Sequence, residues 1–259
     1  MSEKKFEHIV YEKRNSSAWI ILNRPEKLNA LHSITWREIS EALDLAENDD
    51  EVRVVVLTGK GRAFCAGDDI SELSQLLSPS DAIKYFSKMG ETILKILRFS
   101  KPIIAAVNGL AYGGGCEIVE LCDLAIASEN ARFCQPEGLI GAWPPLHAVI
   151  APLIMGRKKA AEMMYTAEPI DAKEAEKVGL INKVVPPEKL EEAVMEMVSK
   201  IRRVAPLGIT TMRKTLYRQF RIDDIETAAR ESIVLAQTED FKEGAKAFLE
   251  KRPAQWKGR

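Results

Sequence analysis

Short apolar runs alternate with longer amphipathic stretches over the first two thirds of the 259-residue chain. The short runs are bounded by Gly, Pro or Asn, which is typical of strands buried on both faces. They occupy residues 19–23, 52–58, 103–108 and 124–127. Apolar positions at helical spacing lie between them, namely Trp36, Ile39, Leu43 and Ala46, and then Phe86, Ile93 and Leu97. We therefore predict an α/β architecture with parallel strands and crossover helices.

The pattern changes to helical spacing alone after about Pro186. One apolar stripe there consists of Leu190, Ala193, Val194, Met197, Val198 and Ile201. Further apolar residues follow at helical spacing from Ile222 to about Glu250. Such a block either packs on the core of its own chain or mediates assembly, and periodicity does not separate these two interpretations.

Composition and charge exclude several classes of protein. The chain has 37 Lys and Arg against 38 Asp and Glu, and 46% of its residues are hydrophobic. These values are those of an ordinary globular protein, and the net charge of -1 argues against nucleic acid as a partner. We find no apolar segment of the length that a signal peptide or a membrane span needs, so we expect no membrane partner and a cytoplasmic location.

The four cysteines form no CxxC pair and lie in apolar or glycine-rich segments. They are Cys65, Cys116, Cys122 and Cys134. We expect buried, reduced thiols. None of the three histidines has ligand spacing to another histidine or to a cysteine, so we expect no metal.

A glycine-rich segment over residues 108–117, NGLAYGGGCE, follows a predicted strand and begins an apolar, helix-compatible run. Because Gly113, Gly114 and Gly115 lack Cβ atoms, the backbone here can offer bare N–H groups at the N-terminal end of a helix. The spacing matches neither a dinucleotide fingerprint nor a P-loop. The segment is a candidate oxyanion site, although a tight turn alone would also explain it.

A second candidate N–H donor follows another strand, where Ala66, Gly67 and Asp68 interrupt the apolar pattern. Loops at the carboxyl ends of parallel strands converge in open α/β folds, so both donors could meet on one carbonyl oxygen. A helix N-cap is the alternative role for Asp68 or Asp69.

Two carboxylates stand in apolar surroundings. Glu117 follows the glycines within the run CEIVELC, and Glu137 follows Cys134-Gln135-Pro136. Desolvation raises the pKa of a carboxyl group, and a shared site raises the pKa of one member further, which yields an acid and a base near neutral pH. A solvated helix position and a turn position remain the alternative interpretations.

Together these segments resemble the crotonase superfamily of enoyl-CoA hydratases and isomerases along nearly the whole chain. The matching stretches begin with Asn23-Arg24-Pro25 and continue with VVVLTGKGRAFCAGDDI, then KPIIAAVNGLAYGGGCEIVELCDLAIASENARFCQPE, then DAKEAEKVGLINKVVP, and end with EDFKEGAKAFLEKRPAQWKG. The resemblance implies a spiral of ββα units over residues 1–200, followed by a helical trimerisation region over residues 201–259. It also implies coenzyme A thioesters as ligands and a homotrimer or a dimer of trimers.

The resemblance assigns roles to residues by position. The backbone N–H groups of Asp68 and Gly114 would hold the thioester oxygen. The acyl-CoA would be contacted by Lys27, Leu28, Ala30, Ala66, Ile70, Phe248 and Lys251. In the hydratases, the positions of the last two reach the nucleotide, often from a neighbouring subunit.

The two glutamates decide the expected chemistry. Hydratases of this superfamily carry both acids 20 residues apart in GGGCE and QPE contexts, as Glu117 and Glu137 are here. The resemblance thus implies syn addition of water to a trans-2-enoyl-CoA, with Glu117 activating the water and Glu137 protonating the α-carbon. Coenzyme A is part of the substrate, and no other cofactor is expected. A Δ3-Δ2 enoyl-CoA isomerase and a non-catalytic acyl-CoA-binding protein are the alternatives.

The chain departs from the family pattern just after Glu137. A glycine-rich stretch is usual there, whereas this chain has Trp143, Pro144, Pro145 and Leu146. These bulky residues should fill or stiffen the acyl end of the pocket, with Trp143 contacting the substrate. His147 is either a third polar group at that end or a structural residue. Asp68 replaces a common alanine, and its carboxylate could repel an anionic substrate.

Overall fold

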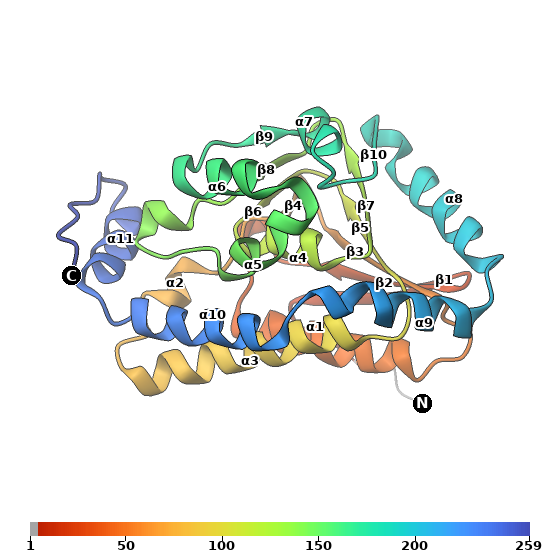
Figure 1. Cartoon of the computed structure of the whole chain (residues 1–259), viewed down its shortest axis with the longest axis horizontal. Helices are drawn as coiled ribbons and strands as arrows, with labels where there is room; N and C mark the ends of the chain where they lie inside the picture. The colour runs from red at the N-terminus through yellow and green to blue at the C-terminus, as the bar shows by residue number, and fades with distance from the viewer. Residues whose placement is uncertain (1–4) are drawn as a thin grey trace.

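The computed structural model describes residues 5–259, and its strands form two sheets (Figure 1). The larger sheet has the order β1-β2-β3-β5-β7-β10, and the smaller has the order β4-β6-β8-β9. The strands of the larger sheet are β1 (Ile9–Arg14), β2 (Ser17–Leu22), β3 (Val54–Gly59), β5 (Ile103–Val107), β7 (Leu124–Ser128) and β10 (Lys183–Val185). Those of the smaller sheet are β4 (Ala63–Cys65), β6 (Leu110–Tyr112), β8 (Arg132–Cys134) and β9 (Ile170–Asp171).

A repeated connection between the sheets generates a spiral. Each of β3, β5 and β7 lies in the larger sheet, and the strand that follows it enters the smaller sheet. All pairings from β2 through β10 in the larger sheet are parallel, whereas β1 pairs antiparallel with β2. The predicted α/β spiral is therefore confirmed, and the four strands predicted from short apolar runs correspond to β2, β3, β5 and β7.

The helices connect these strands and then continue alone to the C-terminus. The first ones are η1 (Pro25–Lys27), α1 (Ser33–Glu47), α2 (Ile70–Leu73), α3 (Pro79–Arg98), α4 (Gly114–Leu121), η2 (Glu137–Ile140), α5 (Pro145–Met155), α6 (Arg157–Thr166) and α7 (Ala172–Lys177). After β10 come η3 (Pro187–Lys189), α8 (Leu190–Arg202), α9 (Pro206–Leu216), η4 (Tyr217–Gln219), α10 (Ile222–Leu235) and α11 (Glu239–Leu249). Figure 1 shows α1, α3 and α10 running along one edge of the molecule.

Apolar side chains cover both faces of the larger sheet. One face joins the main core, and the other packs under α8. The side chains between the sheet and α8 are Trp19, Val54, Val56, Ile104, Ala106, Ile126, Val185, Leu190, Ala193, Val194 and Val198. The first stripe of the late helical block thus packs on its own chain. The division predicted at residue 200 lies inside α8 and stays a prediction.

The last two helices cover the region that carries Glu137. Helix α10 packs on α3 and α5, and α11 packs on η2, whose first residue is Glu137. Gly244 permits this contact, because an added Cβ would lie 2.3 Å from the carbonyl carbon of Ile140. Helix α11 therefore lies beside the segment that follows β8.

The cysteines agree with a further expectation. All four cysteines are buried and unpaired, as predicted. Within residues 5–259, no helix is both long enough and apolar enough to cross a membrane.

Candidate active site

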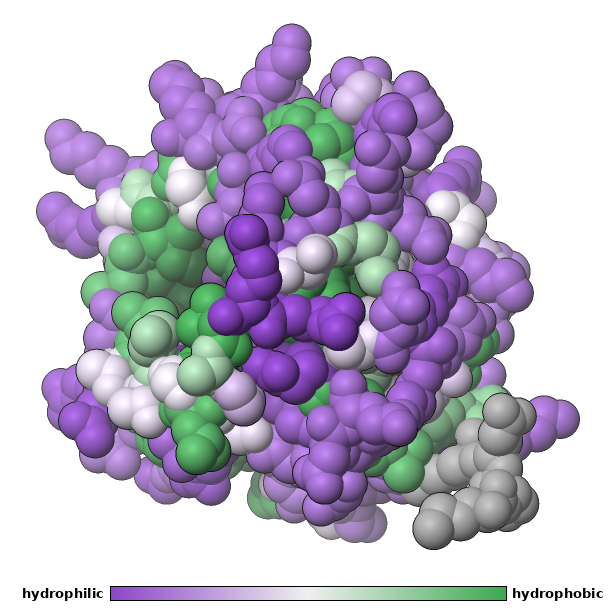
Figure 2. Space-filling view, turned by 90° about the vertical axis from the view of Figure 1, so that its right-hand side faces the viewer, coloured by the Kyte–Doolittle hydropathy of each residue, from purple (hydrophilic) through white to green (hydrophobic). Residues whose placement is uncertain are grey.

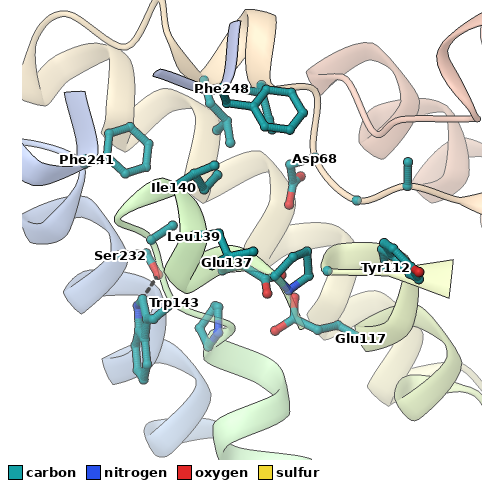
Figure 3. Close-up of a pocket in the computed structure, with 18 of the residues that line it drawn as sticks. Asp68, Tyr112, Glu117, Glu137, Leu139, Ile140, Trp143, Ser232, Phe241 and Phe248 are labelled. Carbon is teal, nitrogen blue, oxygen red and sulfur yellow. Dashed lines mark hydrogen bonds between the residues drawn. The ribbon is translucent and has the colours of Figure 1, made fainter. Parts of the chain in front are cut away.

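An apolar cavity of about 420 Å³ lies between α3, α4, η2, α10 and α11 (Figure 3). Of the residues predicted to form a site, those lining it are Leu28, Ala66, Asp68, Ile70, Glu117, Glu137, Trp143 and Phe248. Lys27, Ala30, Gly114 and Lys251 are outside its lining. Residues that lie as far apart in the sequence as Leu28 and Phe248 therefore line the same cavity.

Two backbone N–H groups lie at the edge of the cavity. Gly114 is the first residue of α4, where a helix leaves N–H groups without intrahelical acceptors. The turn and loop hydrogen bonds among residues 5–259 engage neither this group nor the N–H of Asp68. The two loops are in contact, because a Cβ added to Gly67 would lie 3.5 Å from the nitrogen of Gly114. This arrangement suits an oxyanion hole.

Glu117 lies one turn into α4, and every residue of that helix is buried. Its Oε1 accepts hydrogen bonds from the backbone nitrogens of Leu146 at 2.8 Å and His147 at 3.1 Å. Burial, followed by the charge of Glu120, raises the pKa of Glu117 to about 8. Glu117 is therefore a fixed carboxyl group that changes protonation near neutral pH, which is the property a general base needs.

Glu137 begins η2, and its carboxyl group points toward that of Glu117 in Figure 3. Its Oε2 is buried without a hydrogen-bond partner among the described residues. Burial, followed by the charge of Glu117, raises the pKa of Glu137 well above its ordinary value. A carboxyl group in this position stays protonated and can act as an acid.

The carboxyl group of Asp68 is a third acid at the same cavity. Its Oδ1 accepts hydrogen bonds from Trp36 Nε1 at 3.0 Å and from the Tyr85 hydroxyl at 2.7 Å. Its Oδ2 faces Gly114, where an added Cβ would lie 2.9 Å away. Of Asp68 and Asp69, the helix N-cap is Asp69, because its side chain accepts a hydrogen bond from the backbone N–H of Ser71 at the start of α2.

His147 lies behind Glu117 and does not line the cavity, which favours the structural interpretation of this residue. Its ring is fully buried, with Nδ1 2.5 Å from Glu120 Oε1 and Nε2 3.2 Å from the carbonyl oxygen of Ala160. The side-chain nitrogen of Gln135 also lies 2.9 Å from Nδ1, and the shorter contact of Nδ1 with Glu120 together with that of Nε2 with Ala160 favours hydrogen on both ring nitrogens. Burial alone would lower the pKa of His147, but the charge and hydrogen bond of Glu120 raise it. A buried ion pair thus fixes the backbone that holds Glu117.

Trp143 limits the cavity at the end nearest α10. Its Nε1 donates to Ser232 Oγ at 3.1 Å (Figure 3). Pro145 lines the same end, followed by Leu146, which is buried. The bulky segment therefore narrows one end of the cavity, as the sequence predicts.

Comparison with known proteins identifies the family. The family model described as enoyl-CoA hydratase/isomerase matches residues 12–259. The chain belongs to the enoyl-CoA hydratase/isomerase family. It is 39% identical to a short-chain-enoyl-CoA hydratase of Clostridium acetobutylicum, over 95% of each chain. It is 36% identical to a crotonyl-CoA hydratase of Syntrophomonas wolfei, over 96% of this chain and 97% of that one.

The solved structures agree with this assignment. A carnitinyl-CoA hydratase from Mycobacterium avium superposes with a TM-score of 0.85 at 34% identity, covering 98% of this chain and all of that one. As a member of the enoyl-CoA hydratase/isomerase family, this chain has the fold expected from the resemblance.

The residues that the family resemblance assigns to acyl-CoA contact divide into those that line the cavity and those that lie outside it. Leu28 lines the cavity in a left-handed conformation, with φ 51°, and Ile70 lines it from the start of α2. Lys27 and Lys251 are exposed and lie away from the cavity lining. Phe248 of the same chain lines the cavity while 58% exposed, which places it at the opening. The two lysines are thus available only to a part of a ligand that extends outside the cavity.

Several site residues were not predicted from the sequence. Phe86 had been assigned only to a helical apolar stripe, and it lines the cavity together with Met89 and Ser232. The contacts of Asp68 with Trp36 and Tyr85 also lacked any local signal, because those residues lie 32 and 17 positions away.

Proposed function

We propose that this chain adds water across the 2,3 double bond of a trans-2-enoyl-CoA, or catalyses the reverse dehydration. The observation that carries this proposal is the pair Glu117 and Glu137, two buried carboxyl groups that line one cavity beside two unengaged N–H groups. The names of the hydratase relatives support the same reaction.

The proposed mechanism assigns one task to each group. The N–H groups of Asp68 and Gly114 bind the thioester oxygen, which gains negative charge when water attacks the β-carbon. Losing one such donor typically costs about 10²- to 10³-fold in rate. Glu117 removes a proton from the attacking water, and Glu137 gives a proton to the α-carbon. These steps need no cofactor other than the coenzyme A of the substrate.

The direct test is an assay of purified protein with a panel of trans-2-enoyl-CoAs, beginning with crotonyl-CoA. Hydration removes the conjugated double bond, so the ultraviolet absorbance of the enoyl thioester should fall and a 3-hydroxyacyl-CoA should accumulate. Tight acyl-CoA binding without turnover on the whole panel would instead indicate a binding protein. An isomerase needs only one carboxyl group to move a proton, so the retention of both acids favours the hydratase.

We expect kcat/KM to rise as the pH increases from 6 toward 8. The base must be ionised, and the pKa of Glu117 is about 8, so the active fraction grows over this interval. Glu137, whose pKa is raised well above its ordinary value, keeps its proton over the same interval. The measurement is a pH profile of kcat/KM with crotonyl-CoA, and a flat profile between pH 6 and 8 would contradict the assignment of Glu117 as base.

We expect the Trp143→Ala variant to accept longer acyl chains. Removing the indole enlarges the end of the cavity near Ser232, and each additional buried methylene contributes about 0.8 kcal/mol. The ratio of kcat/KM for trans-2-octenoyl-CoA to that for crotonyl-CoA should rise about tenfold or more. Trp143→Phe is the matched control, because it loses the hydrogen bond but retains most of the volume. An unchanged ratio in both variants would show that Trp143 does not limit the acyl chain.

Assembly and location are further proposals. We propose a homotrimer or a dimer of trimers, supported by exposed apolar side chains of α9, where Leu207 is 81% exposed, Met212 58% and Leu216 64%. Figure 2 shows hydrophobic patches within the mostly hydrophilic face that contains α8 and α9. We propose the cytoplasm as the location, since four unpaired thiols suit a reducing compartment.

A further inference from the structure

The acyl cavity contains more carboxyl groups than hydration requires. Glu117 and Glu137 account for the base and the acid, and Asp68 contributes a third carboxyl group to the same lining. Figure 3 shows Asp68 on the side of the cavity opposite Glu117, with its carboxyl group directed inward. The charge of Asp68 acts on both glutamates and raises the pKa of each. All three groups therefore share one electrostatic environment.

Hydrogen bonding favours the ionised form of Asp68 more than that of Glu137. Its Oδ1 accepts from two side-chain donors, Trp36 Nε1 and the Tyr85 hydroxyl, which stabilise an ionised carboxylate. Glu137 lacks any partner on its buried Oε2 among the described residues. Burial raises the pKa of Asp68, and the two hydrogen bonds oppose that rise. Since both bonds are made to Oδ1, Oδ2 beside Gly114 accepts no side-chain hydrogen bond among the described residues, and its charge can act on a ligand in the cavity.

The rest of the lining contains no compensating charge. None of the described residues that line the cavity is a lysine or an arginine. Its aromatic side chains are Phe86, Tyr112, Trp143, Phe241 and Phe248. Aromatic faces attract cations, and an apolar cavity strengthens the interaction of a ligand charge with a fixed carboxylate.

We propose that Asp68 is a specificity-determining residue that sorts acyl groups by charge, favouring a cationic ammonium substituent and excluding a carboxylate. This inference rests on the proposed function in one respect, because it takes the cavity to be the site that binds the acyl group. The backbone N–H of Asp68 keeps its separate task at the thioester oxygen. Its side chain then selects among acyl-CoAs that all share the same thioester.

Binding of saturated acyl-CoAs tests this proposal without requiring turnover. We would titrate wild type and Asp68→Asn with butyryl-CoA, 4-(trimethylammonio)butyryl-CoA and adipyl-CoA, which are neutral, cationic and anionic at the acyl end. For charges about 7 Å apart at an effective dielectric constant of about 20, each charge should shift Kd relative to butyryl-CoA by about tenfold or more. Wild type should bind the cationic acyl group most tightly and adipyl-CoA most weakly, and in Asp68→Asn the three Kd values should converge.

The controls separate a cavity effect from a general change in charge or stability. Glu72→Gln removes a neighbouring carboxylate on α2 that is outside the cavity lining, and it should preserve the wild-type order. Asp68→Ala is the second variant should Asp68→Asn fail to fold, as judged by circular dichroism. The same spread of Kd values in wild type and the Asp68 variants, or tightest binding of adipyl-CoA by wild type, would overturn the proposal. Absence of crotonyl-CoA hydration would instead overturn the proposed function and leave this binding result unaffected.

Discussion

We expect the Glu137→Gln variant to hydrate crotonyl-CoA about 10²- to 10⁴-fold more slowly than wild type. Glutamine keeps the volume of the side chain but cannot deliver a proton to the α-carbon. The neighbouring carboxyl group of Glu117 is assigned to the attacking water, and Glu137 Oε2 has no hydrogen-bond partner among the described residues that could take over proton delivery. The measurement is kcat from the loss of enoyl-thioester absorbance at saturating substrate.

The controls for this loss address folding and binding. Glu129→Gln changes an exposed glutamate and should retain wild-type kcat. The Kd of Glu137→Gln for butyryl-CoA should stay close to the wild-type value, because the proposed mechanism holds the thioester by backbone N–H groups and not by Glu137. Equal kcat values for Glu137→Gln and wild type would show that the proton donor has been assigned to the wrong residue.

The second large effect is expected in stability. We expect His147→Leu to lower the free energy of unfolding by about 3–5 kcal/mol, because it leaves the carboxylate of Glu120 buried without its cation. Both side chains are 0% exposed, so water cannot replace the lost partner without entering the core. Urea denaturation followed by circular dichroism measures the change.

A double variant separates this ion pair from general packing. Replacing both partners with apolar residues, as in Glu120→Met combined with His147→Leu, removes the charge and its counter-charge together and should cost far less than the two single losses added. If the double variant lost as much free energy of unfolding as the two single variants added together, the two side chains would not interact. The single variant should also reduce kcat, because residues 146 and 147 supply the N–H groups that hold Glu117.

Much of the spiral was predictable because its central strands are largely apolar, whereas the six-residue edge strand β1, IVYEKR, contains three charged residues and was not predicted. Strands β2, β3, β5 and β7 have five or six residues each and gave clear signals. Strands β4, β6 and β8 have three residues each, which is too short for a periodic pattern to emerge. Their positions depend on pairing across the smaller sheet, and a single sequence contains no direct record of that pairing.

The candidate site was predictable where its chemistry is local. The backbone near Gly114 and the carboxyl groups of Glu117 and Glu137 were identified from their sequence contexts. The side-chain role of Asp68 was harder to assign, because Trp36 and Tyr85 reach it from α1 and α3. His147 was ambiguous for the same reason, since its partner Glu120 lies 27 residues away.

Product analysis in ²H₂O with crotonyl-CoA tests the central claim most directly. Syn hydration by Glu117 and Glu137 predicts a 3-hydroxybutyryl-CoA that gains one water, with one solvent deuterium fixed at the α-carbon. Mass spectrometry of the quenched reaction would detect both changes. Deuterium incorporation without the added mass of water, in a product that remains an enoyl-CoA, would contradict hydration and indicate an isomerase.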